Sequence, residues 1–366
     1  MHTIALIFGG RSSEHGISCV TAGGILRQID RSRFDVVPIG VTSDGRFVEV
    51  TGDPEHWQIT NGLAPHVPDS GDEIILQQSR LGQGKVELRA VRDGGRIEHL
   101  AHIDAVFPLL HGPYGEDGTI QGLFELWDVP YVGSGVLASA ASMDKDFTKR
   151  ILQAAGLNVA RGVVVRASEP RATVRERASS LAFPLFVKPA RAGSSFGVTK
   201  VDAPDQLDAA LDEAFRFDPK VLIEQGIEGR EVECGVLQGE NGQAPRTSLP
   251  GEVVIGEDLA FYDYESKYFG KGTVTIDIPA AIPERYVAAV REVAARAFEA
   301  LELEGLARVD VFVTGAGEVI VNEVNTMPGF TQISMFPVLW ENMGISYADL
   351  ISRLIDNALE RGVGLR

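Results

Sequence analysis

The strongest constraint on the fold is the segment ARVDVFVTGAGEVIVNEVN, residues 307–325. Two valine-rich runs flank the turn-forming stretch TGAGE, and this pattern is typical of a β-hairpin. Because the side chains of a strand alternate between two faces, the valines indicate that one face of the hairpin is buried. The other face carries charged and amide side chains.

A two-residue turn at 316–317 would set the register of this hairpin. Asp310 would then lie opposite Glu323, and Arg308 opposite Asn325. All four side chains would share one face. Two facing carboxylates repel each other unless a positive charge lies between them. Mg²⁺ prefers hard oxygen ligands and shares its shell with phosphate, so Asp310, Glu323 and Asn325 are candidate ligands. Arg308 would then be free to stabilise an oxyanion.

Taken alone, the hairpin is equally compatible with a solvated polar face on an exposed surface. A longer loop would also shift the register and move the polar residues of one strand to the other face. The choice between a metal site and an exposed face therefore depends on the other segments.

The chain has 366 residues, enough for two or three domains and a substantial core. Its net charge of −17 argues against a nucleic-acid partner, which requires a basic face. Cys19 and Cys234 lie far apart and form no metal, redox or disulfide spacing, which suits a reducing cytoplasm. The run IALIF is too short for a signal sequence, and no stretch approaches a membrane span. We expect a soluble, cytoplasmic protein with no membrane partner.

The N-terminal third alternates strands with helices, which implies a parallel sheet with crossover connections. The expected elements are the strands TIALIFGG, FDVVPIGV and IDAVFPLLHG and the helices ISCVTAGGILRQI and TIQGLFELWD. Residues 51–101 are rich in Gly, Pro and charge, with the short strands EIILQ and RIEHL. We interpret them as an irregular elaboration of the first domain.

A small α+β unit is expected at roughly 145–224. It contains the helices DKDFTKRILQAAG and PDQLDAALDEAF and the strands VARGVVV, FPLFVKPA, FGVTKV and KVLIEQ. The remainder holds a glycine-rich, aromatic loop at 251–273, the helix ERYVAAVREVAARAFEAL, the hairpin and the helix SYADLISRLIDNALER. The expected domain boundaries are therefore 1–144, 145–224 and 225–366.

Two segments of these later domains could contact a nucleotide. VKPARAGSSFGV (187–198) is a Gly/Ser loop between strands, which can place backbone N–H groups over phosphates, with Lys188 as a point charge. It is not a Walker loop, and a flexible hairpin with a surface lysine is the alternative. In VLIEQGIEGREVE (221–233), Glu224 and Glu231 could contact an adenosine, although exposed loop glutamates are commoner.

Two loops follow buried strands in the first domain, where open α/β sheets bind ligands. They are GGRSSEHGIS (9–18) and HGPYGEDGT (111–119). Glu14 lies near a helix N-terminus, where a carboxylate is favourable for structural reasons alone, or it holds a substrate ammonium. FYDYESKYFG (261–270) could be a lid with Lys267 and Tyr268 reaching inward, or a packed surface loop.

Eight segments in chain order together resemble the D-alanine–D-alanine ligase family of the ATP-grasp superfamily. They are GGRSSEHGIS, HGPYGEDGT, SMDKDFTK, VKPARAGSSFGV, VLIEQGIEGREVE, FYDYESKY, RVD and NEVNTMPG, and they span nearly the whole chain. The resemblance implies an α/β (α+β) fold of three domains, in which a Rossmann-like, parallel-sheet domain precedes two ATP-grasp subdomains.

The roles of the family can be carried over to matching positions. The resemblance implies ATP contacts at Lys145, Lys188, Ser194, Ser195, Glu224, Ile227, Glu231 and Lys267. It implies substrate contacts at Glu14, His111, Lys267, Arg308, Gly329 and Ser334. It implies two Mg²⁺ ions, for which Mn²⁺ can substitute, on Asp310, Glu323 and Asn325. Ser194 and Tyr268 would join Glu14 in a hydrogen-bonded triad that closes the lid. Arg308 and the Gly329 N–H would form the oxyanion site.

The resemblance implies an activity and a partner. The family joins two D-alanine molecules for peptidoglycan synthesis, through a D-alanyl phosphate, and releases ADP and phosphate. A homodimer is suggested in the same way. Ligases that use D-lactate or D-serine as the second substrate are the close alternatives, and Tyr268 beside Lys267 resembles the amine-using enzymes. A non-catalytic ATP-binding regulator is the alternative from another class, but it would not need an oxyanion donor.

Two features depart from the family pattern. His15 and Gly16 follow Glu14 where some members have Arg and Glu. The insertion at 51–101 makes the chain long for the family, and the sequence assigns it no role.

Overall fold

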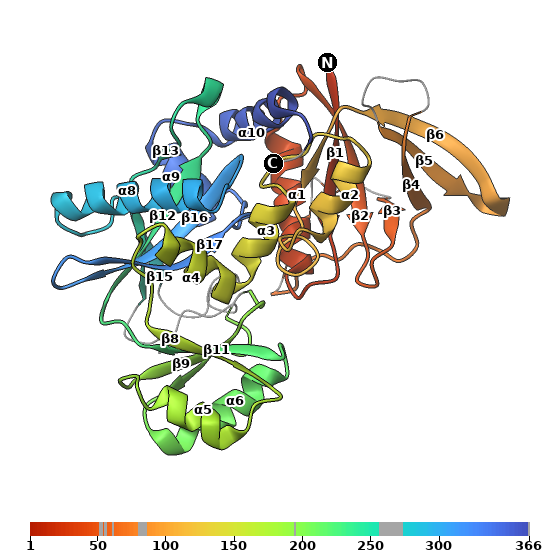
Figure 1. Cartoon of the computed structure of the whole chain (residues 1–366). Coiled ribbons are helices and arrows are strands. Elements are labelled where there is room, and N and C mark those ends of the chain that lie inside the picture. The colour runs from red at the N-terminus through yellow and green to blue at the C-terminus, as the bar shows by residue number, and fades with distance from the viewer. Residues whose placement is uncertain are drawn as a thin grey trace.

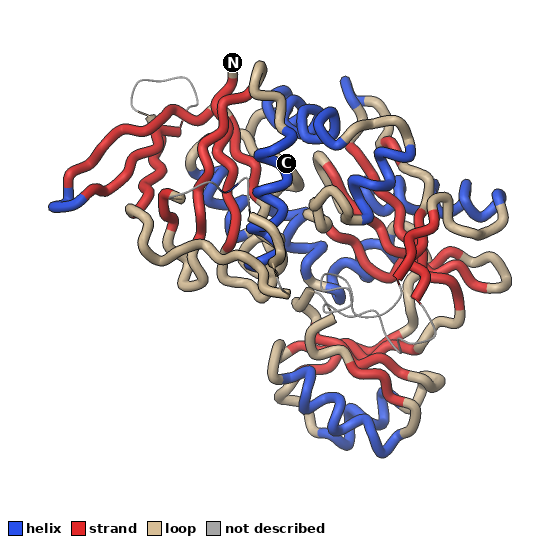
Figure 2. Tube along the Cα trace, turned by 180° about the vertical axis from the view of Figure 1, so that it is seen from behind, coloured by secondary structure: helices blue, strands red, loops and turns tan. Residues whose placement is uncertain are grey.

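The computed structural model describes residues 1–50, 54, 57–60, 62–79, 86–193, 195–255 and 274–364. Within these ranges the strands form three sheets, each with helices on at least one face (Figure 1). The N-terminal sheet lies at one end, the C-terminal sheet at the other, and the small central sheet projects from between them (Figures 1 and 2).

The N-terminal sheet has seven strands in the order β6-β5-β4-β3-β2-β1-β7. Its strands are β1 (His2–Gly9), β2 (Phe34–Val41), β3 (Phe47–Glu49), β4 (Glu73–Gln78), β5 (Val86–Arg92), β6 (Arg96–Ile103) and β7 (Ala105–Pro108). Its helices are α1 (His15–Gln28), α2 (Thr119–Leu126), α3 (Val136–Met143) and the 3-10 turn η2 (Asp93–Gly95). The expected parallel pairing is confirmed for β1 with β2 and β7.

Strands β3 to β6 extend this sheet with antiparallel pairs. Short connections such as η2 can join only antiparallel neighbours, because a parallel pair needs a long crossover. The sequence indicated β4 and β6 but missed β5, whose Val86, Leu88 and Ala90 are fully buried. Much of the segment interpreted as irregular is therefore sheet.

Two helices at the C-terminus connect the outer sheets: the first packs on the C-terminal sheet, and the second packs on α1 and β7 of the N-terminal sheet. They are α9 (Met335–Asn342) and α10 (Tyr347–Arg361). Their side chains share one apolar core with β1, α1 and β7, and Phe330, Phe336 and Trp340 in it are fully buried. Burial of each such side chain stabilises the folded state by about 1.5–3 kcal/mol. This core joins the two ends of the chain, and the helices lie between the outer sheets in both views (Figures 1 and 2).

The central sheet has four antiparallel strands in the order β10-β9-β11-β8. Its elements are β8 (Gly162–Arg166), α5 (Arg171–Ala178), β9 (Leu185–Pro189), β10 (Thr199–Val201), η3 (Pro204–Gln206), α6 (Leu207–Phe215) and β11 (Lys220–Gln225). Helices α5 and α6 cover one face (Figure 1), where Val187 and Ile223 are buried. Because side chains alternate, Lys188 and Glu224 lie on the opposite face.

The C-terminal sheet pairs its strands in the order β15-β14-β12-β16-β17, with β13 beside β12. Its elements are β12 (Gly229–Leu237), η4 (Glu240–Gly242), β13 (Arg246–Thr247), β14 (Gly251–Ile255), β15 (Val274–Asp277), α8 (Glu284–Ala300), β16 (Leu306–Thr314) and β17 (Val319–Asn325). Helices α8 and α4 (Lys145–Ala154) share one core with its inner face. On its outer face, α9 covers part of β12, and polar residues of β12, β16 and β17 occupy the rest.

The hairpin β16–β17 has the expected pairs near its base but not the expected turn. The two-residue turn at 316–317 is wrong, because Thr314 pairs with Glu318 around a three-residue loop whose last member, Gly317, has φ 85°. This shifts the register by one residue. A β-bulge between Asp310 and Val311 shifts it back, so Asp310 still pairs with Glu323.

Candidate active site

One cavity of about 750 Å³ lies where the three sheets meet. Fourteen of the residues expected from the sequence line it, namely Glu14, His111, Lys145, Lys188, Ser195, Glu224, Ile227, Glu231, Arg308, Asp310, Glu323, Asn325, Gly329 and Ser334. The other three, Ser194, Lys267 and Tyr268, lie outside the described residues, as does most of the expected lid loop. The fold therefore brings together every expected site residue that it describes.

Three carboxylates lie abreast on neighbouring strands of the C-terminal sheet. Glu233 of β12 pairs with Asp310 of β16, and Asp310 pairs with Glu323 of β17. Like charges directly opposite each other destabilise a sheet unless a cation neutralises them. The sequence missed Glu233, because the hairpin alone does not reveal which strand lies on the far side of β16.

Arg308 is the cation that joins two of these carboxylates. Its Nε lies 2.8 Å from both Asp310 Oδ1 and Glu233 Oε2, and a terminal nitrogen donates to Asp310 Oδ2 at 2.7 Å. Burial raises the pKa of Asp310 even though Arg308 opposes the shift. Burial also disfavours the charge of Arg308, but Asp310 and Glu233 outweigh it and hold the pKa of Arg308 well above its usual value.

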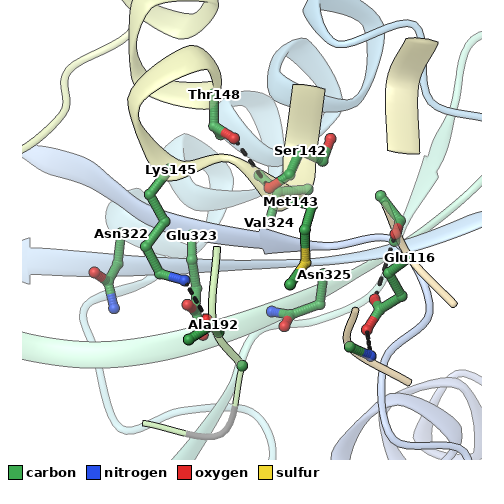
Figure 3. A pocket seen from close by; sticks show the side chains of 13 residues that line it. Glu116, Ser142, Met143, Lys145, Thr148, Ala192, Asn322, Glu323, Val324 and Asn325 are labelled. Atoms are coloured by element: carbon green, nitrogen blue, oxygen red, sulfur yellow. Dashed lines mark hydrogen bonds between the residues drawn. The ribbon is translucent and has the colours of Figure 1, made fainter. Parts of the chain in front are cut away.

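The bulge in β17 decides which amides reach the cavity. Val321 and Val324 both face the core, so the two residues between them, Asn322 and Glu323, turn away from it. Asn322 donates to Glu231 Oε1 at 3.0 Å, and Asn325 donates to Asp310 Oδ2 at 3.0 Å. Figure 3 shows Asn322, Glu323 and Asn325 projecting from one side of the strand.

A buried cluster of lysines around one carboxylate lies across the cavity. Both oxygens of Glu224 face a lysine, with Lys149 at 2.8 Å from Oε1 and Lys188 beside Oε2. Burial raises the pKa of Glu224, but the two lysines outweigh it and lower the pKa. The sequence missed Lys149. Its spacing could have identified it, because Lys149 follows Lys145 by four residues and both lysines therefore lie on one face of α4.

Lys145 connects α4 to the Gly/Ser loop. Its Nζ donates to the Ala192 carbonyl at 2.7 Å, as Figure 3 shows. Burial lowers the pKa of Lys145, against the attraction of Glu323. The loop it contacts has Ser195 in the left-handed region at φ 59°. A smaller pocket of about 60 Å³ shares Lys145 and Glu323 with the main cavity (Figure 3).

Glu14 enters the cavity between two glycines from different domains. A Cβ added to Gly112 would lie 3.0 Å from Glu14 Oε2, and one added to Gly193 would lie 3.1 Å from it. Both contacts are tighter than a side chain normally tolerates. The glycines of HGPYGEDGT and of the Gly/Ser loop therefore allow the Glu14 carboxylate to lie where these two loops meet.

The loop after β7 also holds the segment that follows β17. His111, which is buried, pairs through Nδ1 with the Met327 carbonyl at 3.0 Å. Glu116 accepts N–H groups from Gly112 at 2.7 Å and from Met327 at 2.9 Å. Burial raises the pKa of the Glu116 carboxyl. The sequence missed Glu116, which fixes the chain two residues before Gly329.

Helix α4, which carries both lysines, is fastened to the central sheet by a buried ion cluster. Lys220, with a side chain 3% exposed, lies 2.5 Å from Asp144 and 3.3 Å from Asp146. Asp144 also caps α4 by accepting the N–H groups of Asp146 and Phe147. The position of Lys145 and Lys149 therefore depends on Lys220.

Replacing Lys220 with methionine is expected to lower the free energy of unfolding by about 3–5 kcal/mol, since the buried Asp144 would lose its cation and Asp146 would keep only Arg150. Urea denaturation measures the change. The matched control is Arg150→Met, which removes the other cation of Asp146 from a side chain 64% exposed. A surface pair contributes at most about 1 kcal/mol. An equal loss of unfolding free energy in both variants would contradict the assignment of Lys220 as the stabilising cation of this cluster.

The cavity thus has one cationic wall and one acidic wall. Lys145 of α4 and Lys188 of β9 line the cationic wall, with Lys149 buried behind them against Glu224, and three carboxylates with one arginine lie on β12, β16 and β17. Lysines hold phosphates as point charges, and carboxylates hold hard cations. This arrangement can bind a polyphosphate together with its divalent cation.

Comparisons with known proteins agree with this geometry. Residues 3–134 match the family described as D-ala D-ala ligase N-terminus, and residues 151–356 match the one described as D-ala D-ala ligase C-terminus. A D-alanine–D-alanine ligase of Paenarthrobacter aurescens is 51% identical over 368 residues, which cover 99% of this chain and 96% of the relative. The chain belongs to the D-alanine–D-alanine ligase family.

Solved structures of this family share the fold. The D-Ala:D-Ser ligase VanG of Enterococcus faecalis superposes with a TM-score of 0.82 at 35% identity, over 98% of this chain and 99% of that one. A D-alanine–D-alanine ligase of Bacillus anthracis complexed with ATP gives 0.72 at 25% identity, over 99% and 98%. These findings confirm the family, the three-domain ATP-grasp fold and the ligase class expected from the sequence.

Proposed function

We propose that this chain joins two D-alanine molecules into D-alanyl-D-alanine, with ATP converted to ADP and phosphate. The proposal is carried by one observation, that Arg308 and three carboxylates face a lysine cluster across a single cavity. Membership of the ligase family supports it. A regulator that only binds ATP would gain nothing from a buried arginine aimed at the cavity.

The reaction needs an activated carboxyl group, because a carboxylate delocalises its charge and is a poor electrophile. A carboxylate oxygen of the first D-alanine would attack the γ-phosphorus, ADP would leave, and a D-alanyl phosphate would form. The amine of the second D-alanine would then attack the acyl carbon and lose a proton as phosphate departs. Each step moves negative charge that fixed cations must offset.

The lysines and the arginine would stabilise negative charge at different places in the cavity. Lys145 and Lys188 lie on the wall where the phosphates would bind. Glu224, beside Lys188, and Glu231 line the same cavity, and the resemblance to the family assigns them to the adenosine. Arg308 and the Gly329 N–H would donate to the oxyanion formed when the amine attacks. Glu14, between Gly112 and Gly193, would accept the ammonium of the first D-alanine.

The residues expected to hold Mg²⁺ fit this ion. Asp310, Glu323 and Asn325 present oxygens on the cavity face of the sheet. Among the described residues, no three His, Cys, Asp or Glu side chains form a complete metal cage. Mg²⁺ needs no such cage, since it usually takes one or two carboxylates and completes its shell with water and phosphate. When bound, it would neutralise charge on the transferred phosphoryl group.

Further expectations from the family belong to this proposal. We infer a homodimer, a cytoplasmic location and domain boundaries at 144/145 and 224/225. No helix within the described ranges is long and apolar enough to cross a membrane.

Phosphate release with ATP and Mg²⁺ tests the proposed activity. D-Alanine alone should give one phosphate per dipeptide, while L-alanine should give none. Mixtures of D-alanine with D-serine or D-lactate, analysed for the product by mass spectrometry, test the alternatives. Preferential formation of a mixed product would favour them. Absence of D-alanine-dependent phosphate release would overturn the proposal.

A further inference from the structure

His15, the first residue of α1, makes two hydrogen bonds through its ring. Its Nδ1 lies 2.7 Å from the Gly10 carbonyl, and the Val67 N–H donates to its Nε2 at 3.0 Å. A backbone N–H can only donate, so Nε2 carries the lone pair. A carbonyl can only accept, so Nδ1 carries the proton. The contacts therefore require one neutral tautomer of a ring that is 5% exposed.

The segment at 62–69 packs closely against the same region. A Cβ added to Gly16 would lie 2.4 Å from the Ala64 Cβ, and Val67 approaches the added Cβ positions of Gly9 and Gly40 to 2.7 and 2.5 Å. Only glycine permits these approaches. The segment therefore lies directly on the start of α1 and on the end of β1, and His15 is its polar contact there.

The loop that His15 holds ends at the cavity. On one side, Gly9 N–H donates to Ser18 Oγ at 2.7 Å, and Ser18 donates to the Leu109 carbonyl at 2.6 Å. On the other side, His15 holds Gly10. Glu14, which precedes His15, reaches the cavity between the two glycines described above. A shift of Gly10 or of the start of α1 would move this carboxylate.

We propose that His15 is a positioning residue, which joins the Gly10 carbonyl to the Val67 N–H and thereby fixes the Glu14 carboxylate in the cavity. It acts through Glu14 and touches no substrate. That Glu14 accepts the D-alanine ammonium rests on the proposed function; the contact between His15 and the segment at 62–69 does not. The segment at 62–69 would therefore hold the start of α1, and with it Glu14, in place.

Protonation of His15 would break this contact, because an imidazolium has no acceptor for the Val67 N–H. Burial lowers the pKa of His15 below 6.5, and the nearby His66, whose ring centroid lies 5.4 Å away, lowers it further. The hydrogen bond to Gly10 and the charge of Asp69 act in the opposite direction and raise the pKa. The pKa of His15 is lower in the folded state than in the unfolded state. The contact is therefore complete at any pH above the unfolded-state pKa, and it is lost as the pH falls through the folded-state pKa.

Variants of His15 separate its two bonds. An Asn amide reaches about as far as Nδ1 and keeps the Gly10 bond, whereas it cannot reach Val67. His15→Asn should raise the KM for D-alanine about five- to tenfold, the order expected for one buried hydrogen bond. The KM for ATP should change less than about twofold, because the ATP wall is untouched. His66→Gln, an exposed neighbour, is the matched control and should change neither value.

Two further measurements complete the test. In the wild type, the KM for D-alanine should rise as the pH falls through the lowered pKa of His15, below 6.5, and His15→Asn should lack this additional rise. Hydrogen exchange at the Val67 amide, measured without substrate, should be faster in His15→Asn at pH 7. Unchanged exchange would overturn the contact, whatever the enzyme's reaction. Faster exchange with an unchanged KM for D-alanine, or equal rises in both KM values, would overturn the positioning role.

Discussion

Replacing Arg308 with methionine is expected to lower kcat for D-alanine ligation by about 10²–10³-fold, the loss typical of one oxyanion donor. The KM for ATP should change less than about twofold, because the lysine wall remains. Steady-state phosphate release gives both values. The structural reason is that Arg308 is the described cation closest to both Asp310 and Glu233, with its Nε 2.8 Å from each.

The same variant should also lose stability. Two carboxylates would remain in a buried row without their shared cation, which typically costs about 3–5 kcal/mol. Arg308→Lys separates the two effects, since it keeps a charge but lacks the planar fork that reaches two carboxylates. Its stability should lie between those of the wild type and Arg308→Met, while its kcat should remain low.

A control variant for this experiment lies far from the cavity. Arg353→Met removes an exposed pair with Glu240, so it should change the free energy of unfolding by less than about 1 kcal/mol. Its kcat should match the wild type. A folded Arg308→Met protein with wild-type kcat would remove Arg308 from the reaction.

The double variant Asp310→Asn with Glu323→Gln should lower ADP formation by about 10³-fold, the factor given by ~4 kcal/mol of lost transition-state stabilisation. Both replacements keep the size of the side chain and remove two negative charges from the acidic wall. The fold should survive, because Arg308 retains Glu233 at 2.8 Å and two amide oxygens can still accept hydrogen bonds. Relief of the like-charge row should leave the protein at least as stable as the wild type.

Thermal unfolding distinguishes loss of the metal site from misfolding. Mg²⁺ with ATP should raise the Tm of the wild type, because a ligand that binds only the folded state stabilises it. The double variant should lack most of this increase while keeping its Tm without ligand. Glu318→Gln, at the exposed turn of the same hairpin, removes one carboxylate outside the cavity and is a control that should behave as the wild type. Full ADP formation by the double variant would refute the metal assignment.

The hairpin shows how far a local pattern reaches. The assumed two-residue turn predicted the pairing of Asp310 with Glu323, and alternation along residues 307–325 predicted the polar face that they share; both the pair and the face are confirmed. The assumed turn was wrong by one residue, and the bulge in β17 compensated for it. The bulge also places Asn322 on the cavity side, beside Glu231, and the two-residue-turn pattern gave no sign of it.

The alternation of residues along each strand and the order of the loop motifs are local properties of the sequence. They determined the faces, the family and most of the candidate residues. The tertiary structure alone placed Glu233 beside Asp310, Glu224 between two lysines, and the segment at 62–69 against His15. Each of these contacts joins residues far apart in the chain, and its partner is chosen by which strands and loops pack together. Side-chain periodicity determines which residues share a face, but it carries no information about what that face will meet.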